Sequence, residues 1–392
     1  MIIDGLLHAL KITGVMTWSI LWSLVLGFAL SATIQALVQK KTIAKLLGGD
    51  KPKNAALSAG LGIASSSCSY AAVAIARSLF RQGATFTNAM IFEIASTNLI
   101  VELGIIMALL IGWQFTLAEF IGGPLMIILL AITYRIFLRQ KLIEAAQKQA
   151  NEAVAGAMEG HAAMDMSIAK EGTIFSKLGS KEGMTSISHI FVMELAAVWK
   201  DIVGGLLLAG AVAAWVPSSW WQKLFLSNHH SWSLIWGPVI GPIISLLSFV
   251  CSIGNVPLAA VLWNDGISFG GVMSFIFADL IIIPILLIYR KYYGTKMMLF
   301  ILGSFYVTMV IAGWITEYLF AALSLVPKTH HILVLSDQAI SLNYTTVLNL
   351  IFIALAGFLV YRFIKTGAGP MLKMMNGAPA SMHHHPDHLR HH

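Results

Sequence analysis

An uncharged apolar run, Ile12–Val38, most limits the folds open to this chain. Its 27 residues exceed the roughly 20 that a helix needs to cross a bilayer. The run is too long for a signal-peptide core and no small-residue cleavage site follows it, so we expect it to stay in the mature protein. Only 11% of the 392 residues are charged and 57% are hydrophobic, whereas soluble domains carry about 25% charged residues. The sequence therefore predicts an all-α polytopic membrane protein.

The chain also contains an internal duplication. Ser65–Ile100 overlies Ser248–Ile283 without a gap at a shift of 183 positions, and 12 of the 36 aligned positions are identical. The identical pairs include Cys68 and Cys251, the two cysteines of the chain. Each half thus has one apolar segment that is interrupted by a short stretch rich in serine or glycine, and each stretch carries one cysteine.

Nine apolar segments are candidates for the membrane, and two of them contain these breaks. The nine are Ile12–Val38, Ala55–Phe80, Thr85–Trp113, Phe115–Leu138, Ile190–Val216, Leu234–Trp263, Ser268–Tyr289, Met297–Val326 and Thr345–Val360. If all nine cross, the basic loops alternate between the two sides, contrary to the positive-inside rule. If Ala55–Phe80 and Leu234–Trp263 are re-entrant hairpins, 21 of the 25 lysines and arginines fall on the cytoplasmic side. The charge distribution therefore favours seven spans and two hairpins.

We expect a bacterial inner-membrane protein. In this topology its N-terminus lies outside and its C-terminus lies in the cytoplasm. The hairpins enter from opposite sides, so the halves are predicted to be inverted-topology repeats. Irregular backbone at membrane depth is tolerated where protein or a water-filled cavity covers it. The alternative is a pair of long, kinked helices with a weaker charge bias.

The predicted domain order follows from these segments. It comprises a membrane repeat at 1–138, a cytoplasmic linker at 139–189, a second repeat at 190–326, a further span at 345–365 and a His- and Met-rich cytoplasmic tail at 366–392. The net charge of +7 is ascribed to cytoplasmic loops, and no basic-aromatic surface suggests a nucleic-acid partner. The expected partners are the bilayer and a small solute, and a homo-oligomer is an option. No nucleotide-binding glycine motif or His-Glu-x-x-His occurs, so we expect neither an enzyme nor an ATP-driven pump.

The two cysteines are the first candidates for a binding site. A thiol near the N-terminus of a half-helix has its thiolate favoured by the helix dipole, and thiolates select soft partners such as Cu(I) or trivalent arsenic. The alternative is that each cysteine packs as a small buried hydrophobe. The polar or small residues expected to line the substrate site with Cys68 and Cys251 are Ser67, Ser69, Asn98, Ser252, Gly254 and Asn255.

Two acidic residues inside apolar segments are candidates for coupling. Glu93 lies in the third segment and Asp279 in the seventh, and charges within a membrane are costly and usually functional. Asp279 aligns with Ser96 of the first half, so both halves place polar groups at one depth. A carboxylate there could carry a proton for antiport, with no resident cofactor. The alternative is a structural ion pair with Lys200.

Methionine and histidine cluster in the linker and the tail. Such residues bind soft or borderline metals, although their spacing matches no closed metal site. The candidate ligands are His161, Met164, Met166, His383, His384, His385 and His388.

Several motifs together resemble the ArsP-type predicted permease family. They are Cys68–Ala71, Phe86–Ala89, Glu93–Asn98, Cys251–Pro257, Phe277–Leu280 and the basic stretch Tyr289–Tyr293. The resemblance covers nearly the whole membrane part. It implies an efflux permease, typically for trivalent organoarsenicals, although many members have no known substrate.

The function expected from these features is secondary-active export of a thiophilic metalloid or soft metal. A permease for another small solute or for a transition-metal cation is one alternative. A membrane thiol–disulfide enzyme that uses the same cysteines is another, although no Cys-x-x-Cys motif is present.

The charge distribution makes a topological prediction. Reporter cysteines near Lys148 and Arg390 should react only with reagent on the cytoplasmic side, and reporters near Asp265 and His330 only from outside. Labelling of intact cells and everted vesicles with an impermeant maleimide measures this. The hairpin topology would be wrong if Lys148 and Arg81 lay on opposite faces.

Overall fold

The computed structural model describes residues 2–37, 47–49, 51–65, 69–152, 180–226, 230–248, 252–327 and 344–367. Every regular element in these ranges is a helix, which confirms the predicted all-α class. The first half contains α1 (Ile2–Leu37), α3 (Pro52–Ser65), α4 (Ser69–Arg81), α5 (Phe86–Asn98), α6 (Val101–Leu110), α7 (Trp113–Phe137) and α8 (Gln140–Glu152). The second half contains α11 (Lys181–Trp215), α12 (Ser218–Leu224), α13 (His230–Ser248), α14 (Ser252–Asn264), α15 (Phe269–Phe277), the 3-10 turn η1 (Ala278–Leu280), α16 (Ile283–Tyr293), α17 (Thr295–Ala322) and α18 (Tyr344–Lys365).

Several of these helices are suited to cross a membrane. Within the described part, five are long and apolar enough, and the number rises to seven if each of two bent helix pairs is one span. One bent pair is α5 with α6, which meet at an angle of 40°. The outer helices expose large apolar side chains, such as Leu350 and Ile364 of α18, which an aqueous protein would bury. The chain is therefore a multi-pass membrane protein.

The helices repeat at the same shift of 183 positions that the sequence duplication predicts. Moved by this shift, α4 coincides with α14 at both ends, and α7 falls inside α17. The same shift brings α1 onto α11, α3 into α13, α5 onto α15 with η1, and α6 into α16. The duplication therefore extends to the order and length of the helices in both halves.

The equivalent helices α1 and α11 pack antiparallel. Thr13 Oγ1 donates to Leu206 O at 3.2 Å, whereas Gly5, earlier in α1, lies against the ring of Trp215, later in α11. Earlier residues of α1 thus lie beside later residues of α11, so the two helices run in opposite directions.

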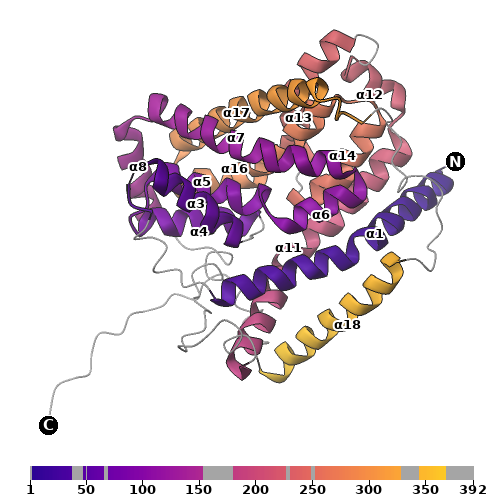
Figure 1. Cartoon of the computed structure of the whole chain (residues 1–392), viewed down its shortest axis with the longest axis horizontal. Coiled ribbons are helices and arrows are strands. Elements are labelled where there is room, and N and C mark those ends of the chain that lie inside the picture. Colours follow the sequence, from indigo (N-terminus) through magenta and orange to yellow (C-terminus); the bar gives the residue numbers. More distant parts are fainter. Residues whose placement is uncertain are drawn as a thin grey trace.

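The equivalent helices α7 and α17 also run in opposite directions. Gly122 lies against Thr316, and Tyr134, near the end of α7, contacts Phe300 near the start of α17 with ring centroids 5.2 Å apart. Figure 1 shows the two helices side by side along one flank of the molecule.

The first cysteine segment folds as a helical hairpin whose two ends meet. The Asn88 side chain donates to Leu47 O at 2.9 Å and to Gly49 O at 2.8 Å, which ties the chain before α3 to the chain after α4. These arms have 14 and 13 residues, or about 20 Å each, less than the roughly 30 Å of a bilayer core.

The second hairpin, α13 and α14, closes in the same way. Gly237 near the start of α13 lies so close to Ser268, which follows α14, that an added Cβ would be 3.1 Å from Ser268 Cβ. Figure 1 shows α3 and α4 at one end of the molecule and α13 and α14 at the other.

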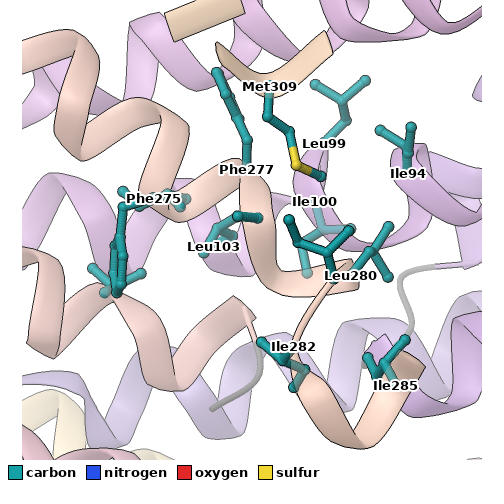
Figure 2. Packing of buried hydrophobic residues seen from close by; sticks show 14 of the residues in the cluster. Ile94, Leu99, Ile100, Leu103, Phe275, Phe277, Leu280, Ile282, Ile285 and Met309 are labelled. Carbon is teal, nitrogen blue, oxygen red and sulfur yellow. The ribbon is translucent and has the colours of Figure 1, made fainter. Parts of the chain in front are cut away.

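The interior is built from the interrupted helices. All side chains of α15 and η1 are buried, as are nearly all of α5 and α14. Figure 2 shows the bend between α5 and α6 packed against the break between α15 and α16. The labelled side chains there are Ile94, Leu99, Ile100, Leu103, Phe275, Phe277, Leu280, Ile282, Ile285 and Met309.

A buried arginine joins the start of the linker to the first hairpin. Arg77 of α4 is fully buried, donates to Ala150 O through Nε at 3.1 Å and Nη2 at 2.6 Å, and lies 4.4 Å from the ring centroid of Tyr292. The carbonyl belongs to the last turn of α8, where a cation is favourable. The linker thus begins as a helix fixed to the membrane part, and α11 begins at Lys181.

The close crossing of α1 and α11 makes a stability prediction. A Cβ added at Gly210 would lie 2.6 Å from Ala9 O, so Gly210→Ala should force the helices apart at a cost of about 1–3 kcal/mol. Gly204 of the same helix has no atom within 4 Å of an added Cβ, so Gly204→Ala is the matched control. Thermal unfolding of both purified variants in detergent should give a lower Tm for Gly210→Ala alone, and equal values would contradict this packing.

Candidate functional site

The helices that follow the two hairpin tips begin at one point inside the protein. Ser69 is the first residue of α4 and Ser252 the first of α14, and their Oγ atoms are 3.4 Å apart. Both side chains are buried. The two serines are equivalent under the shift of 183 positions, so each half contributes the same position to one contact.

The predicted binding residues at the very tips are outside the described part of the chain. They are Ser67, Cys68 and Cys251. In the sequence, each cysteine immediately precedes one of the two touching serines. Gly254, also predicted to line the site, is buried in the first turn of α14.

Asp279 lies at the break between α15 and α16. Its Oδ2 accepts a 2.7 Å hydrogen bond from Ser69 Oγ, and the Ser252 side chain and the Leu280 amide also face the carboxyl group. Its Oδ1 has no partner within hydrogen-bond geometry among the described residues. The tip of the first hairpin is thus bonded to the interrupted helix of the second half.

Asn98 lies at the corresponding break of the first half, where α5 ends. Thr97 Oγ1 donates to Asn98 Oδ1 at 2.9 Å. The side chain is fully buried, and its Nδ2 donates to no described residue. The Glu119 carboxyl of α7 is the group that interacts with this amide, outside normal hydrogen-bond geometry.

Glu93, one turn before Asn98, connects α5 to α16. One carboxylate oxygen accepts a hydrogen bond from the Tyr289 hydroxyl, and the other has no described partner. Asp279 acts electrostatically on this carboxyl, so the two predicted coupling residues belong to one polar cluster. Sequence reasoning did not identify Tyr289 as a partner, because the two residues are 196 positions apart.

Asn255 supports the second hairpin. Its Oδ1 accepts from Ser248 Oγ at 3.2 Å and its Nδ2 donates to Ser245 Oγ at 3.2 Å. These bonds join α14 to α13 beneath the tip. The residue predicted to bind substrate thus lies at the site, with both polar atoms of its amide engaged in holding the arms together.

Glu119 of α7 was missed by the sequence reasoning. Its side chain is fully buried, and neither carboxylate oxygen has a hydrogen-bond partner among the described residues. The Asn98 amide is placed to act on this carboxyl as a hydrogen-bond donor, although outside normal hydrogen-bond geometry, and the Asp279 carboxyl acts on it electrostatically. The available signal was an acid within an apolar span, because Glu119 is the one charged residue between Trp113 and Tyr134.

Other charged candidates lie elsewhere. Lys200, the proposed ion-pair partner, is exposed, with its ammonium 5.9 Å from the ring centroid of Trp199. It therefore does not neutralise the buried acids. The candidate metal ligands of the linker and tail are outside the described ranges; they are His161, Met164, Met166, His383, His384, His385 and His388. Among the residues that are placed, no three His, Cys, Asp or Glu side chains form a group able to hold a metal ion.

The cluster brings hydroxyl groups, carboxyl groups and an unused amide donor to the point where two hairpin tips and two interrupted helices meet. Such groups can exchange protons and bind a small polar solute. Helix interruptions that line a site at membrane depth are typical of transport proteins.

Comparison with known proteins also points to a transport protein. The family described as "Predicted permease", ArsP_1, matches residues 5–318. The chain belongs to this family. It is also 60% identical over 349 residues to "Putative permease Rv2963" of Mycobacterium tuberculosis, an alignment that covers 89% of this chain and 86% of that protein. No solved structure matches the chain. The family assignment identifies this member as a permease and confirms the resemblance deduced from the motifs.

The contact between the tips can be tested in this permease by crosslinking. In a Cys68→Ser/Cys251→Ser background, the pair Ser69→Cys/Ser252→Cys should form a disulfide on mild oxidation, since the two Oγ atoms are 3.4 Å apart. The pair Ser58→Cys/Ser252→Cys is the control, because Ser58 lies about two turns before the end of α3, the other arm of the hairpin. Mass-tagging of the remaining free thiols measures both pairs. Equal crosslinking of the two pairs, or of neither, would contradict the contact.

Proposed function

We propose that this permease exports a thiophilic metalloid or soft metal, such as a trivalent organoarsenical, by secondary-active transport across the bacterial inner membrane. The observation that carries the proposal is the contact between Ser69 and Ser252, because each serine follows one of the two cysteines. Thiolates bind soft metal and metalloid centres. Two thiols contributed from the two tips would bind one such centre far more tightly than either alone, since the second bond is intramolecular.

The two halves, in this proposal, are inverted repeats related by a pseudo-two-fold axis. Equivalent residues touch each other only close to such an axis, which fits Ser69 and Ser252. Equivalent helices that cross the axis run antiparallel, which fits the pairing of α1 with α11 and of α7 with α17. Alternating access would then move one half, or one hairpin, against the other around a fixed site.

The orientation of the half-helices favours anionic ligands at the tips. α4 and α14 both begin at the serine contact, so the positive ends of their dipoles point at the site. A thiolate is stabilised by such a position. The serine hydroxyls and the Asn98 amide would surround a bound solute with hydrogen-bonding groups.

Coupling is assigned to the buried carboxyl groups of Glu93 and Asp279. Asp279 accepts its hydrogen bond from the serine at the first tip, so a change in its protonation would act directly on that tip. Glu93 is held by the Tyr289 hydroxyl in α16. Proton uptake by these groups would link solute export to the proton gradient.

The two cysteines provide the test of this function. Everted vesicles should accumulate methylarsenite or arsenite, and Cys68→Ser and Cys251→Ser should each lose most of this uptake, with the double variant little worse than either single one. Fluorescence-detected size-exclusion should give unchanged yields, because serine nearly matches cysteine in size.

Different outcomes separate the alternatives. If both single variants keep full transport and confer full resistance in cells, thiolate coordination is wrong. Copper uptake in place of arsenical uptake would favour a transition-metal permease. Turnover of a thiol substrate without net solute uptake would favour the thiol–disulfide enzyme.

A further inference from the structure

Glu119 is a buried acid that is not among the residues proposed above for solute binding or coupling. Its side chain has no exposed surface. Glu93 and Asp279 each accept a hydrogen bond from a hydroxyl group, whereas both oxygens of Glu119 are without a hydrogen-bond partner among the described residues. A structural role as a helix cap or hydrogen-bond bridge would require such a partner.

The position of Glu119 on α7 directs it to the two helix breaks. Residues three and four positions apart share one helix face, and Gly122 and Gly123 lie on the face of Glu119. Gly122 packs against Phe277, the last residue of α15, and Gly123 packs against Leu99, which follows α5. The face of α7 that carries Glu119 therefore passes across both interrupted spans.

A second observation points to an exchangeable ligand at this place. The Asn98 Nδ2 is buried and makes no hydrogen bond of normal geometry to a described residue, although the Asn98 side chain is placed to donate to the Glu119 carboxyl. Asp279, whose Oδ1 has no hydrogen-bond partner among the described residues, acts electrostatically on the same carboxyl. Polar groups of three elements are thus within electrostatic range of one another here, and each has at least one atom without a hydrogen bond of normal geometry among the described residues.

The charged neighbours of this point are acidic. Asp279 of η1 acts on Glu119 electrostatically, Glu93 of α5 acts on Asp279, and Glu317 of α17 accepts from the Gly270 amide at 2.5 Å. Glu102 of α6 is directed at Gly27 of α1. A bare charge on Glu119 in such surroundings is strongly unfavourable, and a protonated carboxyl group avoids that cost.

We propose that Glu119, with Asn98 and Asp279, forms a proton-binding site that loads and unloads when the halves of the permease move. When the site opens to one side, the Glu119 proton passes to water and the carboxylate is stabilised by that water and by the Asn98 amide. When the site faces the other side, the carboxylate takes up a proton from water and the site closes again. The inference rests on the proposed function as a secondary transporter, and it is independent of which solute is exported.

The duplication strengthens this assignment. The position equivalent to Glu119 in the second half is Leu302, and the position equivalent to Asp279 in the first half is Ser96. Both helix breaks recur, whereas the acids do not. Glu119 is therefore not needed to build the repeated backbone arrangement.

The proton site is tested first without any solute. Dicyclohexylcarbodiimide modifies carboxyl groups that carry a proton in apolar surroundings, so the purified permease in lipid nanodiscs should be labelled at Glu119, more at pH 6 than at pH 9. Peptide mass spectrometry locates the adduct, and Glu119→Gln should abolish it. Glu317, which is buried and engaged by a backbone amide, is the internal control and should stay unmodified. Labelling of Glu317 but not Glu119 would overturn the proposal, and so would protection of Glu119 by sodium ions at constant pH.

A transport measurement then links the site to coupling. In everted vesicles with methylarsenite as probe, Glu119→Gln should reduce the uptake driven by a pH gradient at least tenfold. Glu119→Asp should keep part of this uptake. Glu144→Gln, at an exposed position of α8, is the control and should match the unmodified protein. Full gradient-driven uptake by Glu119→Gln would overturn the proposal. If the unmodified permease transports no arsenical, the proposed substrate is wrong, and the labelling result alone decides the proton site.

Discussion

The fold depends on one constraint: a helix that is interrupted at membrane depth must have its free polar groups covered by protein. The chain has interruptions at two hairpin tips and in two spans, and the structure gathers the described residues around all four in one interior. Ser69, Ser252 and Asp279 satisfy part of this need through their mutual bonds. The long helices α1, α7, α11 and α17 pack around that interior, and their outward faces remain apolar.

The same constraint explains where close helix packing occurs. Glycines stand at the places where helices of the two halves touch, as at Gly210 between α11 and α1 and at Gly122 between α7 and its neighbours. Without a side chain, these positions let backbones approach closely, which is the main source of helix association in a lipid environment. The two antiparallel contacts hold the halves together around the hairpin tips.

The backbone repeats between the halves, but the chemistry does not. The first half contributes Glu93, Glu119 and Asn98, and the second contributes Asp279 and Asn255. The two equivalent hairpins together form one site. Because the halves carry different polar residues, the two sides of that site differ chemically. A buried cation at Arg77 of the first half adds a further difference, because it holds the end of the linker helix α8 against both α4 and Tyr292 of α16.

The sequence by itself determined the class of protein, the duplication, the positions of the helix breaks and the family, because these follow from local composition and from comparing the chain with itself. It also identified Glu93, Asn98 and Asp279, since polar residues in apolar segments are visible without a structure. Only the tertiary structure decided which of these groups meet. The bond from Tyr289 to Glu93 joins residues 196 positions apart, and the convergence of Glu119 with Asn98 and Asp279 depends on which face α7 presents to the breaks. Such faces are set by the packing of whole helices, and apolar spans of similar composition carry no local signal for it.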